Sequence, residues 1–427
     1  MLLNGIGGIG KTTLAKEYFN KHASDYSHRY WVPFYSSLAE SFVQRFNRFQ
    51  GFEFEGNLNE RFAQILHTLC NLQGDRKLLV LDNFDNEQEF TLLSELLPTF
   101  ELLVTSRLAP KGGGDDIETL KLGILEEKAC KELFYAHYPL TRDDVSLSKL
   151  LKLIGYHTLT TELLAKTAKN GQLQIKELLD LWKEGGVGSE ELEFELYTPY
   201  NPNELTRQEK QLHQILLAAF ELAGIQEEEL WVLRQFSVMP SGVELSLESL
   251  QMLLGFDEGE GKRKALLKLL NSLVSKGWIE ELVLGGVTSW KAHPIIQEVV
   301  RFRLKPVFEE HEVLVENVTN LLGIDQTKDN PVDKFPWVPF GQSVLDFVTG
   351  VSLEELGILQ NNLALVYQAL GDYEQARELL TRALESDLKH FGSEHPTVAV
   401  RQSNLATVYK ALGDYEQARE LLTRALE

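Results

Sequence analysis

The stretch Gly5-Ile6-Gly7-Gly8-Ile9-Gly10-Lys11-Thr12, followed by Thr13, decides the fold of this chain. It fits the pattern G-x-x-x-x-G-K-[ST], in which glycines let backbone N–H groups converge on a phosphate. The apolar residues 1–3 before it predict the end of a buried strand, and residues 12–20 after it predict the first turns of a helix. Strand, glycine loop and helix start are the context that a phosphate-binding loop needs.

This loop supplies the candidate nucleotide-binding residues. Lys11 is expected to reach the β- and γ-phosphates, and the Thr12 hydroxyl to hold Mg²⁺. The expected cofactors are therefore ATP or ADP with Mg²⁺. The residues expected to contact the nucleotide from this loop are Gly5, Gly7, Gly8, Ile9, Gly10, Lys11, Thr12 and Thr13.

A second motif follows at residues 77–83, Lys-Leu-Leu-Val-Leu-Asp-Asn, an apolar run that ends in an acid. Such runs are typical of parallel strands buried on both faces. An acid at the carboxyl end of such a strand points into the crevice where α/β sheets bind ligands. With a phosphate loop upstream, Asp82 is the predicted ligand of Mg²⁺ or of a water on it. Asn83 and Asp85 come next, and the sequence gives neither so clear a role.

A further apolar strand is predicted at residues 102–107, Leu-Leu-Val-Thr-Ser-Arg. Arg107 would emerge at the same edge of the sheet. Two interpretations stay open for it: a side chain that contacts a γ-phosphate, or a surface charge.

The composition limits the class of protein. A chain of 427 residues has room for about three domains. Its net charge of -21 argues against broad binding to nucleic acid or to anionic membranes. Cys70 and Cys130 sit in apolar runs, so neither a disulfide framework nor a metal site is expected. With no apolar stretch near the roughly 20 residues of a membrane span and no secretory signal, a cytoplasmic protein is expected.

Beyond residue 120 the pattern changes. Residues 121–190 have helical apolar spacing and predict a small helical domain. The pattern of residues 205–305 predicts two helices followed by a pair of strands, which is the outline of a winged helix. Residues 306–350 predict a linker, because Pro331, Pro336 and Pro339 lie close together in it.

Basic side chains in the winged-helix segment raise the question of DNA binding. In so acidic a chain, a solvated helix face is the favoured interpretation of them. They are Lys262, Arg263, Lys264 and Lys268.

The end of the chain is a repeat. Residues 363–385 recur as residues 405–427, with a period of 42 residues. The two copies differ only at Leu365/Thr407 and Gln368/Lys410. Each unit predicts two helices around a Gly-Asp turn, so residues 351–427 are expected to form a helical-pair solenoid of two units.

These motifs together resemble a STAND-class signalling ATPase of the NB-ARC type with C-terminal tetratricopeptide repeats. GIGGIGKTT, LLVLDNFD, LLVTSR and the AHP around His293 occur in the family's order. The repeats are similar to those of kinesin light chains, including the turn at residues 392–396. The resemblance implies a multidomain fold: an α/β P-loop NTPase core at residues 1–120, a small helical domain, a winged-helix domain and an all-α tetratricopeptide solenoid.

The resemblance also implies a function, an ATP/ADP-binding molecular switch that hydrolyses ATP slowly. ADP would hold a closed form, and exchange for ATP would open it into a homo-oligomer, while the repeats sense a protein or peptide ligand. Lys11, Asp82 and Arg107 would be the catalytic residues. His293, on the last strand of the wing, would contact the β-phosphate of ADP.

Three departures from the family pattern are visible. Its adenine-contacting Gly-x-Pro motif falls near residues 155–159, where Thr158 stands in place of proline. Asn83 replaces a second acid that many relatives carry, so a general base is not evident. The effector domain that normally precedes the glycine loop is not seen and the chain ends on a repeat helix, so both ends are expected to be cut.

Two other functions remain open from the sequence. One is a transcription regulator that binds DNA through the winged helix under control of ATP. The other is a P-loop kinase for a small molecule, in which the helical, winged and repeat regions would have no role.

Overall fold

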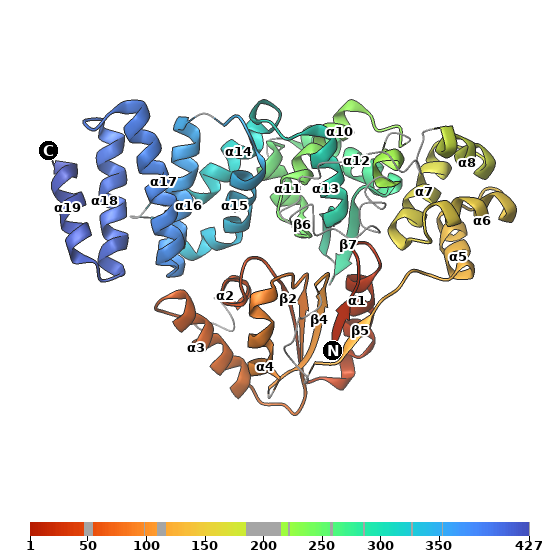
Figure 1. Cartoon of the computed structure of the whole chain (residues 1–427), viewed down its shortest axis with the longest axis horizontal. Coiled ribbons are helices and arrows are strands. Elements are labelled where there is room, and N and C mark those ends of the chain that lie inside the picture. The colour runs from red at the N-terminus through yellow and green to blue at the C-terminus, as the bar shows by residue number, and fades with distance from the viewer. Residues whose placement is uncertain are drawn as a thin grey trace. The chain divides into compact units, whose positions relative to one another are not determined.

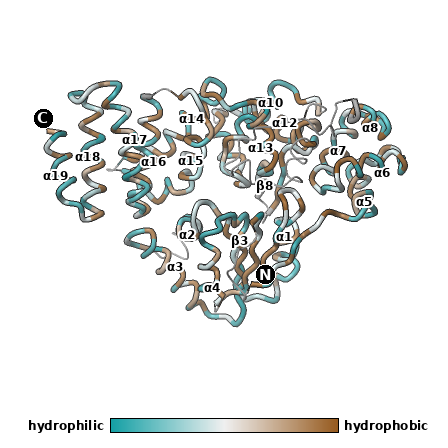
Figure 2. The backbone as a smooth tube through the Cα atoms, viewed as in Figure 1, coloured by the Kyte–Doolittle hydropathy of each residue, from teal (hydrophilic) through white to brown (hydrophobic). Residues whose placement is uncertain are grey.

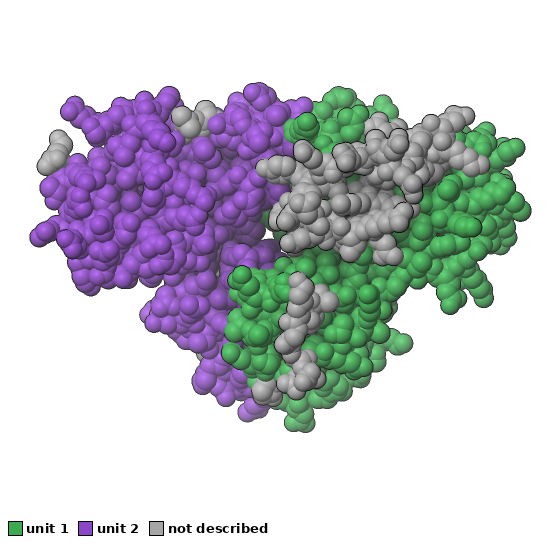
Figure 3. Space-filling view, viewed as in Figure 1, with its two compact units in different colours: residues 1–33, 74–305 green, residues 34–73, 306–427 purple. Residues whose placement is uncertain are grey.

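The computed structural model describes residues 1–46, 54–97, 99–108, 117–184, 215–220, 223–256, 259–284, 287–325, 328–351 and 353–426. The chain forms two compact units, coloured separately in Figure 3. Unit 1 comprises Met1–Pro33 and Gly74–Lys305, and unit 2 comprises Phe34–Gln73 and Pro306–Glu427. None of the described helices is long and apolar enough to cross a membrane.

Unit 1 contains a five-stranded sheet in which every pair of neighbouring strands is parallel. The strand order is β2-β3-β4-β1-β5, so β4 lies between the strand before the phosphate loop and the strand that ends at Asp82. Every residue of β3 is buried, as its apolar run predicts, and the hydrophobic colour in Figure 2 gathers on the strands around it. The strands are β1 (Leu2–Asn4), β2 (His28–Pro33), β3 (Lys77–Asp82), β4 (Glu101–Ser106) and β5 (Thr119–Lys121).

The first helix packs on this sheet. Ala15 of α1 is fully buried in a small core with Leu3, Leu78 and Val80 from the strands, which fixes the strand–loop–helix unit predicted around the glycine motif. Short helices lead into β2 and β4. The helices of this part are α1 (Lys11–Lys21), η1 (Ala23–Asp25), η3 (Glu87–Leu92) and α4 (Leu93–Leu96).

The predicted helical domain follows the sheet. Its core joins Phe134, Leu147, Leu164 and Leu178, one from each of four helices, and each of these side chains is fully buried. The composition of residues 184–204, rich in Gly, Glu and Pro, predicts a linker, and all of it after residue 184 lies outside the described residues. The four helices are α5 (Glu127–His137), α6 (Asp144–Leu153), α7 (Thr158–Asn170) and α8 (Ile175–Glu184).

The rest of unit 1 has the order of elements expected of a winged helix. Three helices within residues 227–276 precede the last two strands, and a further two-residue strand, β6, lies between the first and second of these helices and pairs with β8, so the antiparallel sheet has the order β6-β8-β7. The winged-helix assignment itself stays a prediction. The two glycines at 285–286, which predict a turn between its paired strands, lie outside the described residues. The elements are α10 (Glu227–Ser237), β6 (Leu245–Ser246), α11 (Leu247–Leu254), α12 (Glu260–Lys276), β7 (Glu280–Leu284), β8 (Val287–Lys291) and α13 (Pro294–Leu304).

In unit 2, residues 306–350 contain helices, whereas a linker was expected there. That prediction is wrong, because α14, η5 and α15 occupy most of this range. Two of its prolines lie at helix starts, where the missing N–H would have no intrahelical partner: Pro331 is the first residue of η5 and Pro339 lies in the first turn of α15. Pro336 lies inside η5. The helices are α2 (Leu38–Phe46), α3 (Leu58–Asn71), α14 (Phe308–Leu322), η5 (Pro331–Trp337) and α15 (Val338–Phe347).

The repeats form two helical pairs, as predicted, and these are the last helices of the chain (Figure 1). Leu363 and Val366 of the first unit are fully buried, and so is Val408 of the second, the repeat equivalent of Val366. The units are joined by the Asn404 amide, whose Nδ2 donates to the Asn361 Oδ1 at 2.8 Å. The pairs are α16 (Leu353–Leu370) with α17 (Tyr373–Phe391), and α18 (Pro396–Ala411) with α19 (Tyr415–Leu426).

Candidate nucleotide site

The phosphate loop, residues 5–10, connects β1 to α1. Gly8 and Gly10 have φ values of 71° and 104°, a left-handed conformation that costs glycine little. A Cβ atom on Gly8 would also lie 2.9 Å from the His157 Cε1. Gly10 is the N-cap of α1, so the loop ends where the helix presents its unpaired N–H groups.

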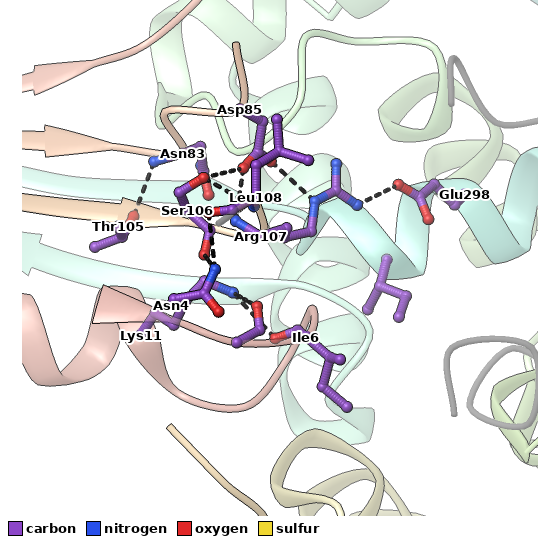
Figure 4. A network of polar contacts seen from close by, with 12 residues as sticks. Asn4, Ile6, Lys11, Asn83, Asp85, Thr105, Ser106, Arg107, Leu108 and Glu298 are labelled. Carbon is purple, nitrogen blue, oxygen red and sulfur yellow. Dashed lines mark hydrogen bonds and ion pairs between the residues drawn. The ribbon is translucent and has the colours of Figure 1, made fainter. Parts of the chain in front are cut away.

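Lys11 is folded over this loop. The residue is only 7% exposed, and its Nζ donates to the carbonyl oxygens of Gly5 at 2.7 Å and Ile6 at 3.0 Å (Figure 4). A buried ammonium needs such acceptors, because its charge is costly away from water. The positive charge is thereby held at the loop, where the sequence predicts phosphate.

Thr12 and Asp82 are brought together across the sheet edge. The Thr12 Oγ1 donates to the Asp82 Oδ1 at 2.8 Å. The Thr105 Oγ1, from the end of β4, donates to the same oxygen at 2.6 Å. The two residues predicted to hold the metal are thus in contact. Thr105, for which the sequence predicted only a place in a strand, orients the Asp82 carboxylate.

The chemistry of this pair fits Mg²⁺. A hydroxyl and a carboxylate are the hard oxygen donors that Mg²⁺ prefers, and it is usually held by one or two protein oxygens together with substrate phosphates. Within the described residues, no group of three or more His, Cys, Asp or Glu side chains is placed to hold a metal ion.

Asn83 follows Asp82 in a left-handed conformation, with φ of 60°. Asparagine tolerates this region better than most residues. Its backbone N–H donates to the Thr105 Oγ1 at 2.9 Å. Since the Asn83 amide cannot accept a proton as a base, the structure leaves the prediction of slow turnover in place.

Arg107 lies between two carboxylates (Figure 4). Its Nε donates to the Asp85 Oδ2 at 2.9 Å and its Nη1 to the Glu298 Oε1 at 3.1 Å. Asp85 also accepts from the Arg107 backbone N–H at 2.7 Å and from the Ser106 hydroxyl at 3.0 Å. Asp85 thus holds Arg107 at the end of β4. Through its bond to Glu298, Arg107 is also linked to α13, the helix after the three-stranded sheet. A role for Arg107 at a γ-phosphate stays a prediction.

Three consecutive carbonyls of the phosphate loop accept hydrogen bonds from the start of α7. The His157 Nε2 donates to the Gly7 oxygen at 2.9 Å, the Leu159 N–H to the Gly8 oxygen at 3.2 Å, and the Thr158 hydroxyl to the Ile9 oxygen at 3.4 Å. We call residues 157–159 the loop clasp. By engaging the carbonyls on one side, the clasp fixes the peptide planes whose N–H groups face the other way.

The tautomer of His157 follows from its neighbours. Its Nδ1 accepts from the Thr160 N–H at 3.4 Å, so the ring hydrogen is on Nε2, toward Gly7. Burial lowers the pKa of His157 to about 4, and the Lys11 charge acts in the same direction, while the hydrogen bond to Gly7 opposes both. A neutral imidazole therefore holds the loop at pH 7.

Thr158 is the residue that stands where the family motif has proline. It is the first residue of α7, a position that proline also suits. The adenine contact of that motif stays untested for this chain. What the structure adds is a contact that proline would lack, the hydroxyl bond to Ile9.

His293 was expected on the last strand of the wing. It lies instead two residues beyond the end of β8, where it is the N-cap of α13. Its Nδ1 accepts from the Ile295 N–H at 3.3 Å, which satisfies one of the first N–H groups of that helix. Burial lowers the pKa of His293 to about 3, helped by the charges of Lys291 and Lys11. The ring is thus neutral, with a donor hydrogen on Nε2.

The start of α13 lies over the phosphate loop. A Cβ atom on Gly7 would be 3.5 Å from the Ile295 Cδ1. The loop is therefore approached by α7 on its carbonyl side and by α13 at Gly7. Neither His157 nor Glu298 was singled out from the sequence, since their partners are 150 and 191 residues away and no local pattern connects them.

Two family models match parts of the chain. A model of the NB-ARC domain matches residues 1–139, and a model of the tetratricopeptide repeat matches residues 355–427. No curated protein matches the chain.

Two solved structures are similar to the chain. The STAND (Signal Transduction ATPase with Numerous Domains) protein with a tetratricopeptide repeat sensor from Pyrococcus horikoshii has 19% sequence identity and a TM-score of 0.51, with 100% of this chain and 61% of that one covered. A Walker-type ATPase of Pyrococcus abyssi has 14% identity and a TM-score of 0.30, with 70% of this chain and 90% of that one covered. This chain thus spans 61% of the length of the STAND structure, and that likeness concerns the fold. The chain is a multidomain P-loop protein that combines an NB-ARC domain with C-terminal tetratricopeptide repeats.

Proposed function

We propose that the chain is a cytoplasmic, nucleotide-dependent molecular switch that binds ATP and ADP with Mg²⁺. The observation that carries the proposal is the 2.8 Å contact between Thr12 and Asp82 beside the buried Lys11 amine. The NB-ARC match over residues 1–139 supports it. Magnesium would neutralise phosphate charge when bound, and this chain's own groups would position it.

Each residue of the site has a defined task in this proposal. Lys11 exchanges its loop carbonyls for phosphate oxygens, and Thr12 and Asp82 offer oxygens to the metal. Thr105 keeps the Asp82 carboxylate turned toward Thr12. Asn83, in place of an acid, cannot take a proton from water, so hydrolysis is slow enough to give each nucleotide state a lifetime.

The switching element is the start of α13. The neutral His293 ring offers its Nε2–H to a β-phosphate oxygen, and the Arg107–Glu298 ion pair ties the same helix to the sheet edge. Exchange of ADP for ATP releases α13, opens the molecule and exposes surfaces that join copies into a homo-oligomer. The repeats sense a protein or peptide ligand and bias this exchange.

No observation favours the two other functions. In α12, Lys264 pairs with Glu260 at 2.7 Å, as on a solvated helix face, and the net charge is -21. A small-molecule kinase would leave the repeats without a task. DNA binding that weakens steeply with salt, or transfer of phosphate to an acceptor, would replace the switch by one of these.

The test is to identify the nucleotide that the protein carries. The purified chain is denatured with acid, and the released nucleotides are separated by ion-exchange chromatography. We expect ADP in about equal molar amount to protein, because a switch rests in its closed state. Protein that is free of nucleotide and fails to take up ADP with Mg²⁺ would refute the proposal.

A further inference from the structure

Two carboxylates hold Arg107, and they belong to different elements of unit 1 (Figure 4). Asp85, in the segment that follows β3, accepts from the Arg107 Nε at 2.9 Å, and Glu298 on α13 accepts from its Nη1 at 3.1 Å. Asp85 also accepts from the Ser106 hydroxyl and the Arg107 backbone N–H, so it is fixed to the end of β4. Glu298 is instead carried by the helix that the proposed switch releases.

The Glu298 carboxylate is not a surface charge. The residue is 5% exposed, and a buried carboxylate depends on the cations and donors around it, because its desolvation is costly. Arg107 is one such cation, and Arg301 on the same helix lies within electrostatic reach of both Glu298 and Arg107. Arg301 moves with Glu298, whereas Arg107 belongs to the sheet edge. The Arg107–Glu298 pair is therefore an ionic contact that breaks when α13 leaves.

A γ-phosphate would compete with Glu298 for Arg107. The family resemblance makes this phosphate the expected ligand of Arg107, and a guanidinium binds phosphate and carboxylate oxygens with the same fork of N–H donors. With α13 in place, the Arg107 charge is already paired with two acids. ATP must therefore displace one of them, and Glu298 is the one that is not fixed to the sheet. ADP has no γ-phosphate and binds without this competition.

We propose that Glu298 is a specificity-determining residue that makes the nucleotide site favour ADP over ATP, because its carboxylate competes with the γ-phosphate for the Arg107 guanidinium. This rests on the proposed function and names the contact by which the site distinguishes the two nucleotides. The coupling is reciprocal. The factor by which the Glu298 contact weakens ATP binding is also the factor by which bound ATP weakens the hold of Arg107 on α13.

Three variants separate this competition from other effects. Glu298→Gln removes the negative charge at nearly constant volume, and Arg107→Gln removes the group for which carboxylate and phosphate compete. Glu229→Gln is the matched control, since Glu229 is also 5% exposed and also forms an ion pair, with Lys276 at 2.6 Å. Lys276 is not part of the nucleotide site, so this control reproduces the loss of a buried ion pair without a change at Arg107.

The measurement is the ratio of two dissociation constants. Protein stripped of nucleotide is titrated calorimetrically with ADP and Mg²⁺, and separately with the non-hydrolysed ATP analogue adenylyl imidodiphosphate and Mg²⁺. We expect Glu298→Gln to shift the ratio toward the ATP analogue about tenfold, the effect of one hydrogen bond to a charged group. Arg107→Gln should shift it toward ADP, and Glu229→Gln should leave it unchanged. In the double variant the ratio should equal that of Arg107→Gln, because Glu298 acts only through Arg107.

Other results overturn the proposal. An unchanged ratio in Glu298→Gln, or a shift toward ADP, would show that Glu298 positions Arg107 for the phosphate rather than competing with it. An equal shift with and without Arg107 would show that the Glu298 charge repels phosphate directly. If Glu298→Gln does not fold, Glu298→Asp withdraws the same carboxylate by one methylene and should shift the ratio in the same direction by a smaller factor. An unchanged ratio in that variant overturns the proposal as well.

Binding of ADP by itself tests the proposed function on the same samples. Wild-type protein that does not bind ADP would refute the switch. Protein that binds ADP while the ratio stays unaltered in the Glu298 variants refutes only the role of Glu298.

Discussion

The nucleotide site of unit 1 and the repeats of unit 2 are held together by contacts of very different range. In the site, His157 reaches Gly7 across 150 residues and Glu298 reaches Arg107 across 191. In the repeats, the bond between Asn361 and Asn404 spans 43 residues. The site is thus a single assembly of distant parts, whereas the repeats are a stack of neighbours. A change in the site should act on the whole of it, and a change in the repeats should act locally.

The repeats contain the same comparison at smaller scale. Helices α17 and α19 share the sequence YEQARELLTRAL, but Leu380 is 0% exposed and its equivalent Leu422 is 47% exposed. Likewise, Leu384 is 8% exposed and Leu426 is 89% exposed. The reason is that α17 packs against both α16 and α18, whereas α19 packs against α18. Identical sequence therefore gives different burial when the neighbours differ.

The largest effect is expected where one residue serves the whole site. Asp82→Ala removes the acceptor shared by Thr12 and Thr105 together with the predicted metal ligand, so Mg²⁺-dependent ATP hydrolysis should fall on the order of a hundredfold or more. Steady-state release of phosphate measures it. Asn83→Asp is the neighbouring control, and it should leave hydrolysis unchanged or raise it. If hydrolysis survives in Asp82→Ala, this carboxylate does not hold the metal.

The next effect uses the matched leucines of the repeats. Leu380→Ala should lower the free energy of unfolding by about 2–5 kcal/mol, the cost of a cavity in a packed core. Leu422→Ala should cost less than about 1 kcal/mol, because its side chain is already half exposed. Denaturant unfolding gives both values. Equal losses would show that burial in the repeats is set by the sequence rather than by neighbours.

The same contrast should appear without mutation in amide hydrogen exchange. The final pair, and α19 above all, is expected to be the least protected part of the repeats, because it buries least apolar surface. Strong protection of residues 405–426 in a monomeric sample would contradict the view that each repeat unit is stabilised mainly by its neighbours.

A smaller effect is expected from the loop clasp. His157→Ala leaves the Gly7 carbonyl without its donor, which should weaken binding of ADP with Mg²⁺ about tenfold. Thr158→Val removes only the longest of the three bonds, at 3.4 Å, and should have a smaller effect. Calorimetric titration ranks the two variants. A clasp that merely supports the fold would lower the melting temperature of both and leave affinity unchanged.

The smallest effect is an opposite response of the two units to pH. His157 has a pKa of about 4 in the folded protein against 6.5 when exposed. The unfolded state therefore binds more protons between these values, and unit 1 should lose stability as pH falls below 6.5. In unit 2, burial raises the pKa of Glu40 from 4.5 to about 7, and the charge of Asp372 adds to this, although Ser36 and Gln44 donate hydrogen bonds to its carboxylate. Here the folded state binds more protons, so stability should fall as pH rises from 4.5 to 7.

Amide exchange at pH 5 and pH 7.5, corrected for intrinsic rates, reads the two units separately. Each group should contribute at most about 1.4 kcal/mol per pH unit. Glu40→Gln should flatten the response of unit 2 and leave that of unit 1 as it was. The same sign in both units would show that other groups control the response.

The range of contacts also decides what could be predicted from the sequence. The strand and helix around the phosphate loop and the fully buried β3 follow from local pattern, and the repeats follow from their period. Thr12 and Asp82 were predicted from motifs that carry their own geometry. His157 and Glu298 have no such signal, because only the fold brings them to their partners.

Two errors have local physical causes. The prolines of residues 306–350 were taken as signs of a linker, but Pro331 and Pro339 lie at helix starts, where proline fits. His293 was expected on the last strand of the wing, as the family resemblance implies. It begins α13 instead, because a residue before proline with a side-chain acceptor is a good N-cap.

The most direct test of the account is whether Lys11 holds the nucleotide. Protein stripped of bound nucleotide is titrated calorimetrically with ADP and Mg²⁺, and Lys11→Ala is compared with the wild type. Lys21→Ala, which removes an exposed lysine from the last turn of the same helix, is the control. The account predicts one site in the wild type and in Lys21→Ala, and about a hundredfold or greater loss of affinity in Lys11→Ala. Unchanged affinity in Lys11→Ala would contradict it.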